Sequence, residues 1–397
     1  MNASVTASND ISASGALWAA IPQDTDQSGT NVVVFNPTTG QFEYTGSYSN
    51  NTDELDDDWH ITADNTAVTS SRNVLITASM AQGDAGNVVA VNSFAQGQQV
   101  IATGENSHAQ GLSTQALGDY SHAEGDTTLA VANISHTEGS NTRTNGIGSH
   151  AEGFGSSTSA TAPYSHAEGI GTTTEGIGAH SEGSGSEAAG DYSHAEGIGT
   201  TTTGVGSHAS GVETFALQTG SFAMGWRTRA EGEFSHTQGW YTTASGVYSH
   251  AEGLNTIANG STSHAEGEFT IASGFAAHSE GRWTTASGDY AHSAGRLSEA
   301  LGDYSHASGR HTIASGSYQM VTGKFNTHGN EDSLFVIGNG TSDGSRNDFI
   351  RFDQDGGGNS TIILDPNSLP TSAAGLASGQ LWRESDGSGG WNLKINI

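Results

Sequence analysis

The chain has 397 residues, of which only 33% are hydrophobic and 14% are charged, and its formal net charge is -30. This acidity argues against nucleic acid as a partner, because a phosphate backbone is bound by a basic surface. The sequence contains no cysteine, which excludes disulfides and thiolate metal sites. Low hydrophobicity with high net charge is typical of disorder, but a disordered chain has no long-range period, and this one does.

The N-terminal region, residues 1–78, is predicted to be a separate β region. Residues 31–48, NVVVFNPTTGQFEYTGSY, place alternating apolar runs on both sides of an NPTTG turn, which is a strong hairpin signal. The opening residues MNASVTASNDISASG contain neither a positive charge nor an apolar run, so we expect no secretory signal. No segment approaches the ~18 apolar residues of a membrane span, so we expect no membrane insertion.

Residues 79–323 are dominated by a repeat in which SHAEG, or a close variant, returns every 14 residues. One step, between His150 and His166, is 16 residues long, and the residues SSTSATAP there are predicted to add a bulge or loop. The repeat gives 18 units, and its closing glycine is present in all of them, from Gly83 to Gly323.

Each unit is predicted to form two short strands joined by two tight corners, because 14 residues are too few for two helices. YSHAEG is expected to be one strand and TTASG to lead through the second, with glycines supplying positive φ at the corners. Stacked in parallel at about 4.8 Å per coil, the units form a rod on the order of 85 Å long. We therefore expect an all-β parallel solenoid of 18 coils. Its inward Ala and Ser residues bury little surface, so identical chains are expected to associate laterally.

Histidine and glutamate recur at two positions of the repeat, two residues apart and hence on one face of a strand. Where His gives way to Phe222, the glutamate gives way to Met224, so the two columns are expected to contact each other. Stacked like charges would repel by about 3.5 kcal/mol per pair at an effective dielectric of ~20, so the columns need mutual hydrogen bonding or partial neutralisation. We interpret them as a structural ladder, either inside the coil or along the axis of an oligomer. The predicted ladder comprises His108, His122, His136, His150, His166, His180, His194, His236, His250, His264, His278, Glu124, Glu138, Glu152, Glu168, Glu182, Glu196, Glu252, Glu266 and Glu280.

Occasional capture of a metal by three symmetry-related histidines is a less favoured alternative. Catalysis is less favoured still, because an active site does not repeat along a rod. No metal, no cofactor and no catalytic residue is predicted.

Units such as TTASGVYSHAEG, residues 242–253, resemble the head repeats of YadA-like trimeric adhesins. The resemblance extends over residues 79–323. It implies a left-handed parallel β-roll and a homotrimer in which three rolls pack into one head. The chain differs in carrying His and Glu where many such heads carry Val and Ile.

Residues 324–397 are predicted to form a C-terminal β cap and tail module. Residues 334–337 and 349–352 are expected to be strands separated by Asn/Gly turns. Residues 324–360, together with the ending LPTSAAGLASGQLWRESDGSGGWNLKINI, resemble segments of phage tail and fibre proteins. This resemblance implies a virion protein that has other virion proteins as partners, and by analogy residues 1–78 would attach it to the particle.

Aromatic side chains gather just after the repeat glycine, at one corner of the coil, with Arg282, Arg296 and Arg310 at or near the same corner. Because residues one coil apart are neighbours, these rings are candidates for an exposed ligand platform that binds a host cell-surface glycan or protein receptor. The favoured alternative is that they fill the groove between subunits. The predicted platform comprises Trp226, Arg227, Trp240, Tyr241 and Trp283.

The leading functional prediction is a non-enzymatic trimeric phage fibre or spike, carried on the tail or capsid surface and extracellular when it contacts the host. Alternatives are the passenger of a cellular trimeric adhesin and a capsid decoration protein. A polysaccharide depolymerase is less favoured, because it would need paired carboxylates in a groove, whereas the repeat offers only columns of one kind.

Overall fold

The computed structural model describes residues 30–36, 41–48, 59–61, 68–70, 80–83, 88–329, 331–354, 358–378, 380–387 and 391–395. The chain divides into two compact units, Met1–Leu75 and Ile76–Ile397. In the first unit, β1 (Thr30–Asn36) pairs antiparallel with β2 (Gln41–Tyr48), which confirms the predicted hairpin, although its turn lies outside the described residues. A second antiparallel pair joins β3 (Trp59–Ile61) to β4 (Val68–Ser70).

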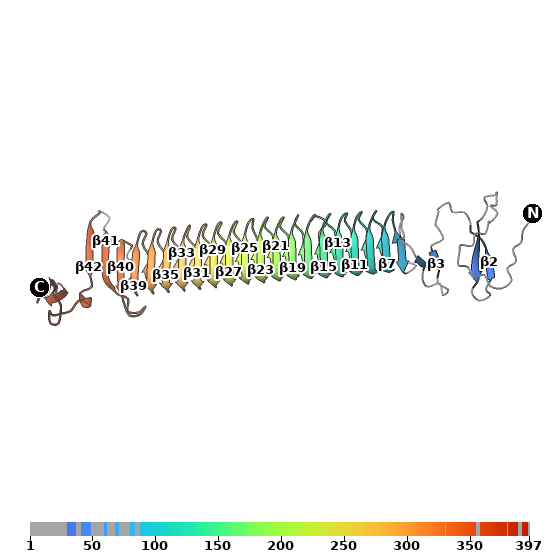
Figure 1. Ribbon diagram of the computed structural model, residues 1–397. Coiled ribbons are helices and arrows are strands. Elements are labelled where there is room, and N and C mark those ends of the chain that lie inside the picture. The colour runs from blue at the N-terminus through green and yellow to red at the C-terminus, as the bar shows by residue number, and fades with distance from the viewer. Residues whose placement is uncertain are drawn as a thin grey trace, which may run out of the picture. The chain divides into compact units, whose positions relative to one another are not determined.

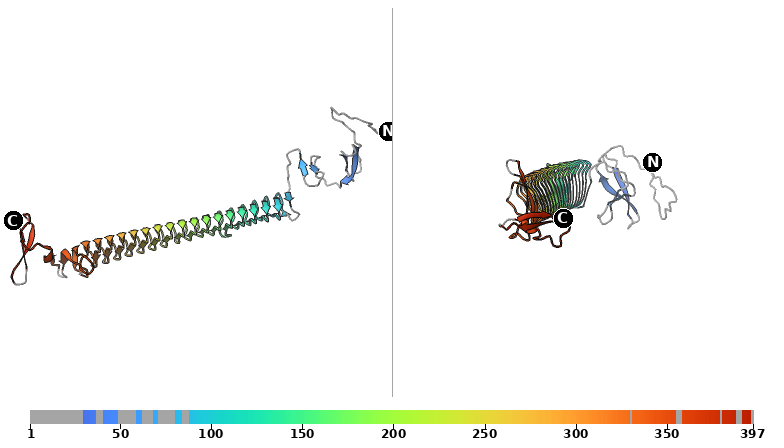
Figure 2. Two further views of the ribbon diagram at one scale, coloured as in Figure 1. Left: turned by 90° about the horizontal axis from the view of Figure 1, so that it is seen from below. Right: turned by 90° about the vertical axis from the view of Figure 1, so that its left-hand side faces the viewer.

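The second unit is a parallel β-solenoid whose coils follow one another along a single axis (Figure 1). Viewed from its end, the stack is narrow and the coils nearly superpose (Figure 2). Each coil contributes one long strand, which pairs in parallel with the strand one unit later, for example His250 with His264. The long strands are β5 (Met80–Gly83), β7 (Phe94–Gln98), β9 (His108–Leu112), β11 (His122–Asp126), β13 (His136–Ser140), β15 (His150–Phe154), β17 (His166–Ile170), β19 (His180–Ser184), β21 (His194–Ile198), β23 (His208–Val212), β25 (Phe222–Trp226), β27 (His236–Trp240), β29 (His250–Leu254), β31 (His264–Glu268), β33 (His278–Arg282), β35 (His292–Arg296), β37 (His306–Arg310) and β39 (Met320–Lys324).

A second parallel ladder runs along the other side of the coil and consists of two-residue strands, for example Ile257 paired with Ile271. This confirms the prediction of two strands per coil, but the second strand is much shorter than the first. The short strands are β6 (Val88–Val89), β8 (Ile101–Ala102), β10 (Gln115–Ala116), β12 (Leu129–Ala130), β14 (Arg143–Thr144), β16 (Ser157–Thr158), β18 (Thr173–Thr174), β20 (Glu187–Ala188), β22 (Thr201–Thr202), β24 (Phe215–Ala216), β26 (Arg229–Ala230), β28 (Thr243–Ala244), β30 (Ile257–Ala258), β32 (Ile271–Ala272), β34 (Thr285–Ala286), β36 (Glu299–Ala300) and β38 (Ile313–Ala314).

The interior of the solenoid is filled by small side chains. In the coil that begins at β29, Ala251, Thr256 and Ala258 are completely buried, and Ser263 is 1% exposed. Only a few buried side chains along the rod, such as Val100 and Val321, are larger than threonine. Alternation along the strand explains this pattern, because Ser and Ala point inward while the His and Glu on either side of that Ala point outward. Each coil therefore buries little apolar surface, as the composition predicts.

The two glycines found in most units serve different purposes. Gly253, the closing glycine of SHAEG, has a φ of +111°, which only glycine adopts readily, and a Cβ there would lie 2.1 Å from the carbonyl oxygen of Gly267. The second glycine, such as Gly260, was also expected to supply a positive φ, and this is wrong. Its φ is ordinary, but a Cβ would lie 1.9 Å from the carbonyl oxygen of Gly274 in the next coil. Non-glycine residues such as Asn255 (φ 52°) and Tyr248 (φ 58°) take the left-handed conformation at the corners instead.

The extra two residues of the long repeat lie in the corner that follows β16, between Thr158 and His166, as predicted. At the C-terminal end, β40 (Ser333–Asn339) extends the long ladder in parallel, and β41 (Asp348–Gln354) and β42 (Ser360–Leu364) follow as antiparallel strands. The strands expected at 334–337 and 349–352 are thus present. A 3-10 turn (Pro366–Ser368) and the antiparallel pair β43 (Leu381–Ser385) and β44 (Trp391–Ile395) come next.

The described part of the chain is all-β apart from that 3-10 turn. Within it, no helix combines the length and the hydropathy that crossing a bilayer requires.

Candidate functional site

The predicted His/Glu ladder lies on the outer face of the long strands, so its placement inside the coil is wrong. The imidazole rings stack along the rod: the His150 and His166 rings are 4.7 Å apart and 3° from parallel, and those of His278 and His292 are 4.8 Å apart and 1° from parallel. The parallel register of the strands produces this stack, because it sets each histidine beside the histidine of the next coil. Their side chains are about one-third exposed in the single chain.

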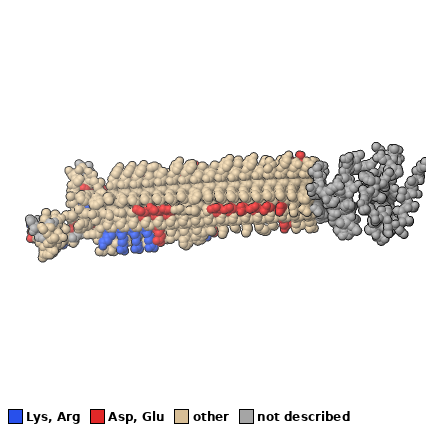
Figure 3. Space-filling view, in the orientation of Figure 1, with Lys and Arg blue, Asp and Glu red and all other residues tan. Residues whose placement is uncertain are grey.

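The glutamates form a second column beside the rings, and each carboxylate lies near an imidazole Nε2. Within one coil, the Nε2 of His122 and the carboxylate of Glu124 are 3.5 Å apart. Figure 3 shows the carboxylates as red rows along one face of the rod. Contact between the histidine column and the glutamate column therefore explains why both residues are replaced together in the same unit.

Several histidines of the ladder have a lowered pKa. Burial, together with the repulsion that charged rings at His136 and His166 would exert, lowers the pKa of His150 to about 4. The pKa values of His122, His180 and His250 are lowered for the same first reason. At neutral pH these four rings are consequently uncharged and lie beside a row of carboxylates.

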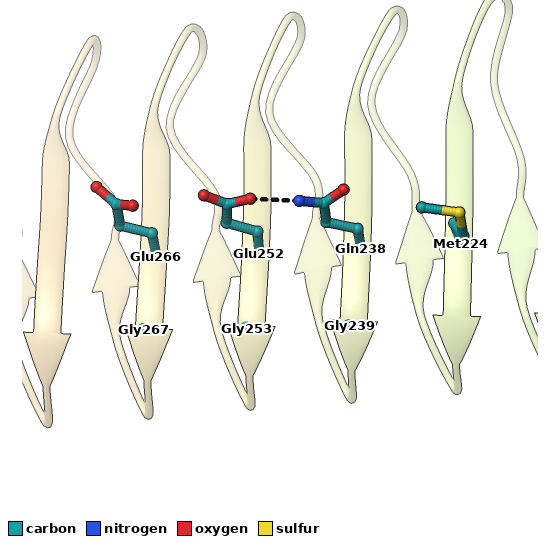
Figure 4. Close-up of a pocket in the computed structure, with 7 residues that line it drawn as sticks. All are labelled: Met224, Gln238, Gly239, Glu252, Gly253, Glu266 and Gly267. Atoms are coloured by element: carbon teal, nitrogen blue, oxygen red, sulfur yellow. Dashed lines mark hydrogen bonds between the residues drawn. The ribbon is translucent and has the colours of Figure 1, made fainter.

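The ladder is interrupted where Phe222 and Met224 replace His and Glu in β25. Phe222 keeps the column of rings continuous but does not stack: its ring lies 4.9 Å from that of His208 at a tilt of 39° and 4.9 Å from that of His236 edge-on at 87°. Met224 begins a shallow groove of about 450 Å³ that continues past Gln238, Glu252 and Glu266 and is floored by the repeat glycines (Figure 4). Gln238 donates a hydrogen bond to Glu252 there, which removes one like-charge contact.

Several ladder segments bring together the ligand types that a divalent metal uses. One such group is His150, Glu152 and His166, whose three ligand atoms lie within 4.8 Å of one another. A tetrahedral zinc site holds its nitrogen and oxygen ligands at about 2.0–2.2 Å from the ion, so these atoms would have to converge before they could bind one. The groups satisfy the donor chemistry but not the spacing of a formed site.

Four of the five residues of the predicted platform lie together. The Trp226 ring is 5.0 Å from that of Trp240 and 5.1 Å from that of Tyr241, and the Arg227 guanidinium lies 4.7 Å from the Trp226 ring centre. Trp240 is 48% exposed. Trp283 is not part of this cluster, because it lies three coils further on and packs against Phe269 and Arg282 instead.

Sequence reasoning missed a column of exposed tyrosines at the other end of the long strands. The rings of Tyr290, Tyr304 and Tyr318 stack at 4.9 Å and 5.0 Å, and Tyr304 is 51% exposed. The signal was available, because a tyrosine stands two residues before the histidine position in many units.

Two stretches of the solenoid, residues 102–126 and 251–277, match the family model described as the YadA head domain repeat. A comparison with curated proteins found no match. The solenoid thus contains YadA head domain repeats, as its sequence pattern and its 14-residue coils both indicate.

Proposed function

We propose that this chain is the rod of a homotrimeric, non-catalytic adhesive fibre, and that the fibre belongs to a phage particle. The observation that carries the proposal is the distribution of side-chain size across the coil. Ala, Ser and Thr fill the interior, whereas large apolar side chains stand outside it. A solenoid of this kind gains burial by lateral association, and a closed cyclic arrangement is the usual form that such association takes.

The exposed apolar side chains lie in columns that flank the ladder face. Ile170 and Ile198, at the end of the long strands, are 59% and 57% exposed. Tyr192 and Tyr248, at the corner before the long strands, are 70% and 62% exposed. Exposed apolar side chains arranged in this way mark a contact with another protein, and identical neighbouring chains would cover them in the coils between β17 and β21.

The ladder also favours an adjoining chain. The Nε2 atoms of His166 and His250, among others, are closed to solvent and form no hydrogen bond within the described chain. A buried polar atom without a partner is costly. In the proposed trimer the carboxylates of a neighbouring chain supply acceptors for these atoms.

Adhesion is supported by the YadA head repeats and by the aromatic cluster around Trp226. Rings and a guanidinium gathered on an exposed corner suit a sugar ring or a protein hot spot. A non-catalytic role is supported by the repetition of one side-chain arrangement on successive coils. The phage assignment is supported by the resemblance of the C-terminal segments to phage tail and fibre proteins.

A cellular trimeric adhesin is the second candidate, and the matched repeat favours it directly. Electron microscopy of purified phage particles from the producing strain, with a gold label on the N-terminus of this chain, distinguishes the two. The proposal predicts labelled rods projecting from the tail or capsid. Label on the cell envelope, with none on particles, would assign the chain to a cellular adhesin.

A further inference from the structure

Basic residues are rare in this chain, and a third of them stand in one column. The sequence contains 12 Lys and Arg residues against 42 Asp and Glu residues. Four of the 12 occupy the last position of consecutive long strands, where Arg282 pairs with Arg296, Arg296 with Arg310, and Arg310 with Lys324. They form the blue row near the C-terminal end of the rod (Figure 3). We call these four residues the basic column.

Most of the basic column is not neutralised by the protein. Arg282 forms an ion pair with Glu268, with a distance of 2.9 Å between its Nε and the carboxylate. Arg296, Arg310 and Lys324 form no ion pair with any residue that the structure describes. Arg227 and Arg229, elsewhere on the rod, are each paired with a glutamate. Three adjacent cations therefore remain without counterions in a strongly acidic protein.

Aromatic rings beside the column pack against three of its guanidinium groups. Trp283 lies 4.0 Å from the Arg282 guanidinium and 5.7 Å from that of Arg296. Phe325 lies 5.3 Å from the Arg310 guanidinium and stacks on His311 with a ring separation of 4.4 Å. A guanidinium packed against a ring retains N–H donors in its plane, and these bind carboxylate, sulfate or phosphate oxygens in pairs.

We propose that the basic column binds a linear anionic glycan, one that carries carboxylate, sulfate or phosphate groups along its chain. Strand spacing sets the four cations about 4.8 Å apart, so that together they span about 14 Å, the scale of a few sugar residues. Trp283 supplies the apolar ring on which a sugar face packs. Nucleic acid is disfavoured as the occupant, because a duplex carries one charge per ~1.7 Å and four cations would leave most of its phosphates facing a protein of net charge -30, whereas a sparsely charged glycan leaves few such charges. The inference rests on the proposed adhesive function and gives the chemical class of a surface ligand.

The test compares the Arg296→Gln/Arg310→Gln double variant with an Arg143→Gln/Lys394→Gln double variant of the full chain, which has the same net charge. Binding to immobilised alginate and dextran sulfate is measured as a function of salt, with neutral dextran and a single-stranded oligonucleotide as comparison surfaces. We expect the column variant to bind the anionic polymers at least tenfold more weakly and the control variant to bind as the wild type does. The slope of log affinity against log salt should fall by roughly one to two, since two ionic contacts are lost.

Three results would overturn the inference. Equal weakening in both double variants would mean that net charge, and not the column, governs binding. Binding of the oligonucleotide as tight as that of the glycans would remove the glycan assignment. Loss of the oligomer in the column variant, measured by sedimentation, would show that these arginines contact a neighbouring subunit.

Cell binding separates this inference from the proposed function. Suppose that the wild-type rod binds host cells, and that the column variant binds the cells and the anionic polymers as well as the wild type does. The proposed glycan site is then wrong, and the proposed adhesive function is unaffected. If the wild-type rod binds no cells, adhesion fails, whatever the polymer measurements show.

Discussion

The Nε2 of His278 lies 3.1 Å from a carboxylate oxygen of Glu266, which belongs to the preceding coil. His292 repeats the relationship with Glu280 at 3.2 Å. In most earlier coils the nearest carboxylate belongs to the same coil, as in the 3.5 Å approach between His150 and Glu152, whereas His208 and His264 approach the glutamate of the preceding coil. The ladder therefore connects neighbouring coils as well as positions within one coil. A substitution in one coil should accordingly affect the His–Glu contacts of the adjacent coils.

The substitution His250→Phe tests the coupling between the two columns. Alone it leaves Glu252 beside an apolar ring without its imidazole neighbour, and we expect a loss of about 1–3 kcal/mol in the free energy of unfolding. Adding Glu252→Met recreates the natural Phe222–Met224 pair and should recover much of that loss. Thermal unfolding followed by circular dichroism measures both variants. Equal midpoints for the single and double variants would mean that the columns do not act as a pair.

The pH dependence of stability follows from the lowered histidine pKa values. Well above pH 6.5 the histidines with a lowered pKa, such as His150, His180 and His250, are neutral in the folded and unfolded chain, and they add no pH dependence. Between pH 6.5 and the folded-state pKa, which is about 4 for His150, the unfolded chain takes up protons that the folded ladder excludes. Stability should therefore fall as the pH is lowered through this range and level off below it.

The control for this pH effect is the His150→Phe/Glu152→Met variant. It removes one of the most strongly shifted groups, so its unfolding midpoint should decrease less between pH 7 and pH 4.5 than that of the wild type. A rod whose midpoint rises on acidification would instead carry protonated, ion-paired histidines.

Gly260, a second glycine of the repeat, is predicted to tolerate a side chain poorly because the next coil lies close to it, although Ala132 and Gln218 occupy the same position in other coils. Gly260→Ala would place a methyl group 1.9 Å from a backbone oxygen of the next coil, and a loss of at least about 3 kcal/mol is expected. Gly171→Ala is the matched control, because Gly171 has a φ of +62° but open space around its Cβ direction. Its cost should be only about 1 kcal/mol, from the left-handed backbone alone. Similar unfolding midpoints for the two variants would contradict the close approach of the coils.

The aromatic platform is tested by Trp226→Ala and Trp240→Ala, each measured on a glycan array and on host cells. Truncation of a binding hot spot costs more than about 1 kcal/mol, so we expect at least a fivefold loss of affinity for each variant. Phe349→Ala is the comparison, because Phe349 is exposed and lies outside both the platform and the basic column. Binding by both platform variants at the wild-type level would remove the platform from the account.

The sequence alone was sufficient to predict the solenoid, since the 14-residue period, the closing glycine and the alternation around the buried alanine each dictate one feature of the coil. The sequence did not determine whether His and Glu point inward or outward. Alternation along a strand shows which residues share a face, but it does not show which face is inward. Only the burial of Ala251 beside His250 decides that question. The assignment of Trp283 to the platform failed for a related reason. Sharing a corner of the repeat does not bring together residues that are three coils apart.

The role of the second glycine could not be predicted from the sequence either. A glycine needed for a positive φ and one needed for close approach are indistinguishable in a sequence, and Gly260 belongs to the second kind. At that corner the left-handed backbone is carried by Thr262 and its counterparts, which the glycine pattern does not reveal.

The mass of the purified chain in solution, measured by sedimentation equilibrium at nanomolar to micromolar concentration, tests the central claim most directly. The account predicts a single species of three times the mass of one chain, persisting on dilution until the rod unfolds. A stable, folded monomer throughout that range would show that the solenoid is stable without neighbouring chains and would contradict the proposed trimer.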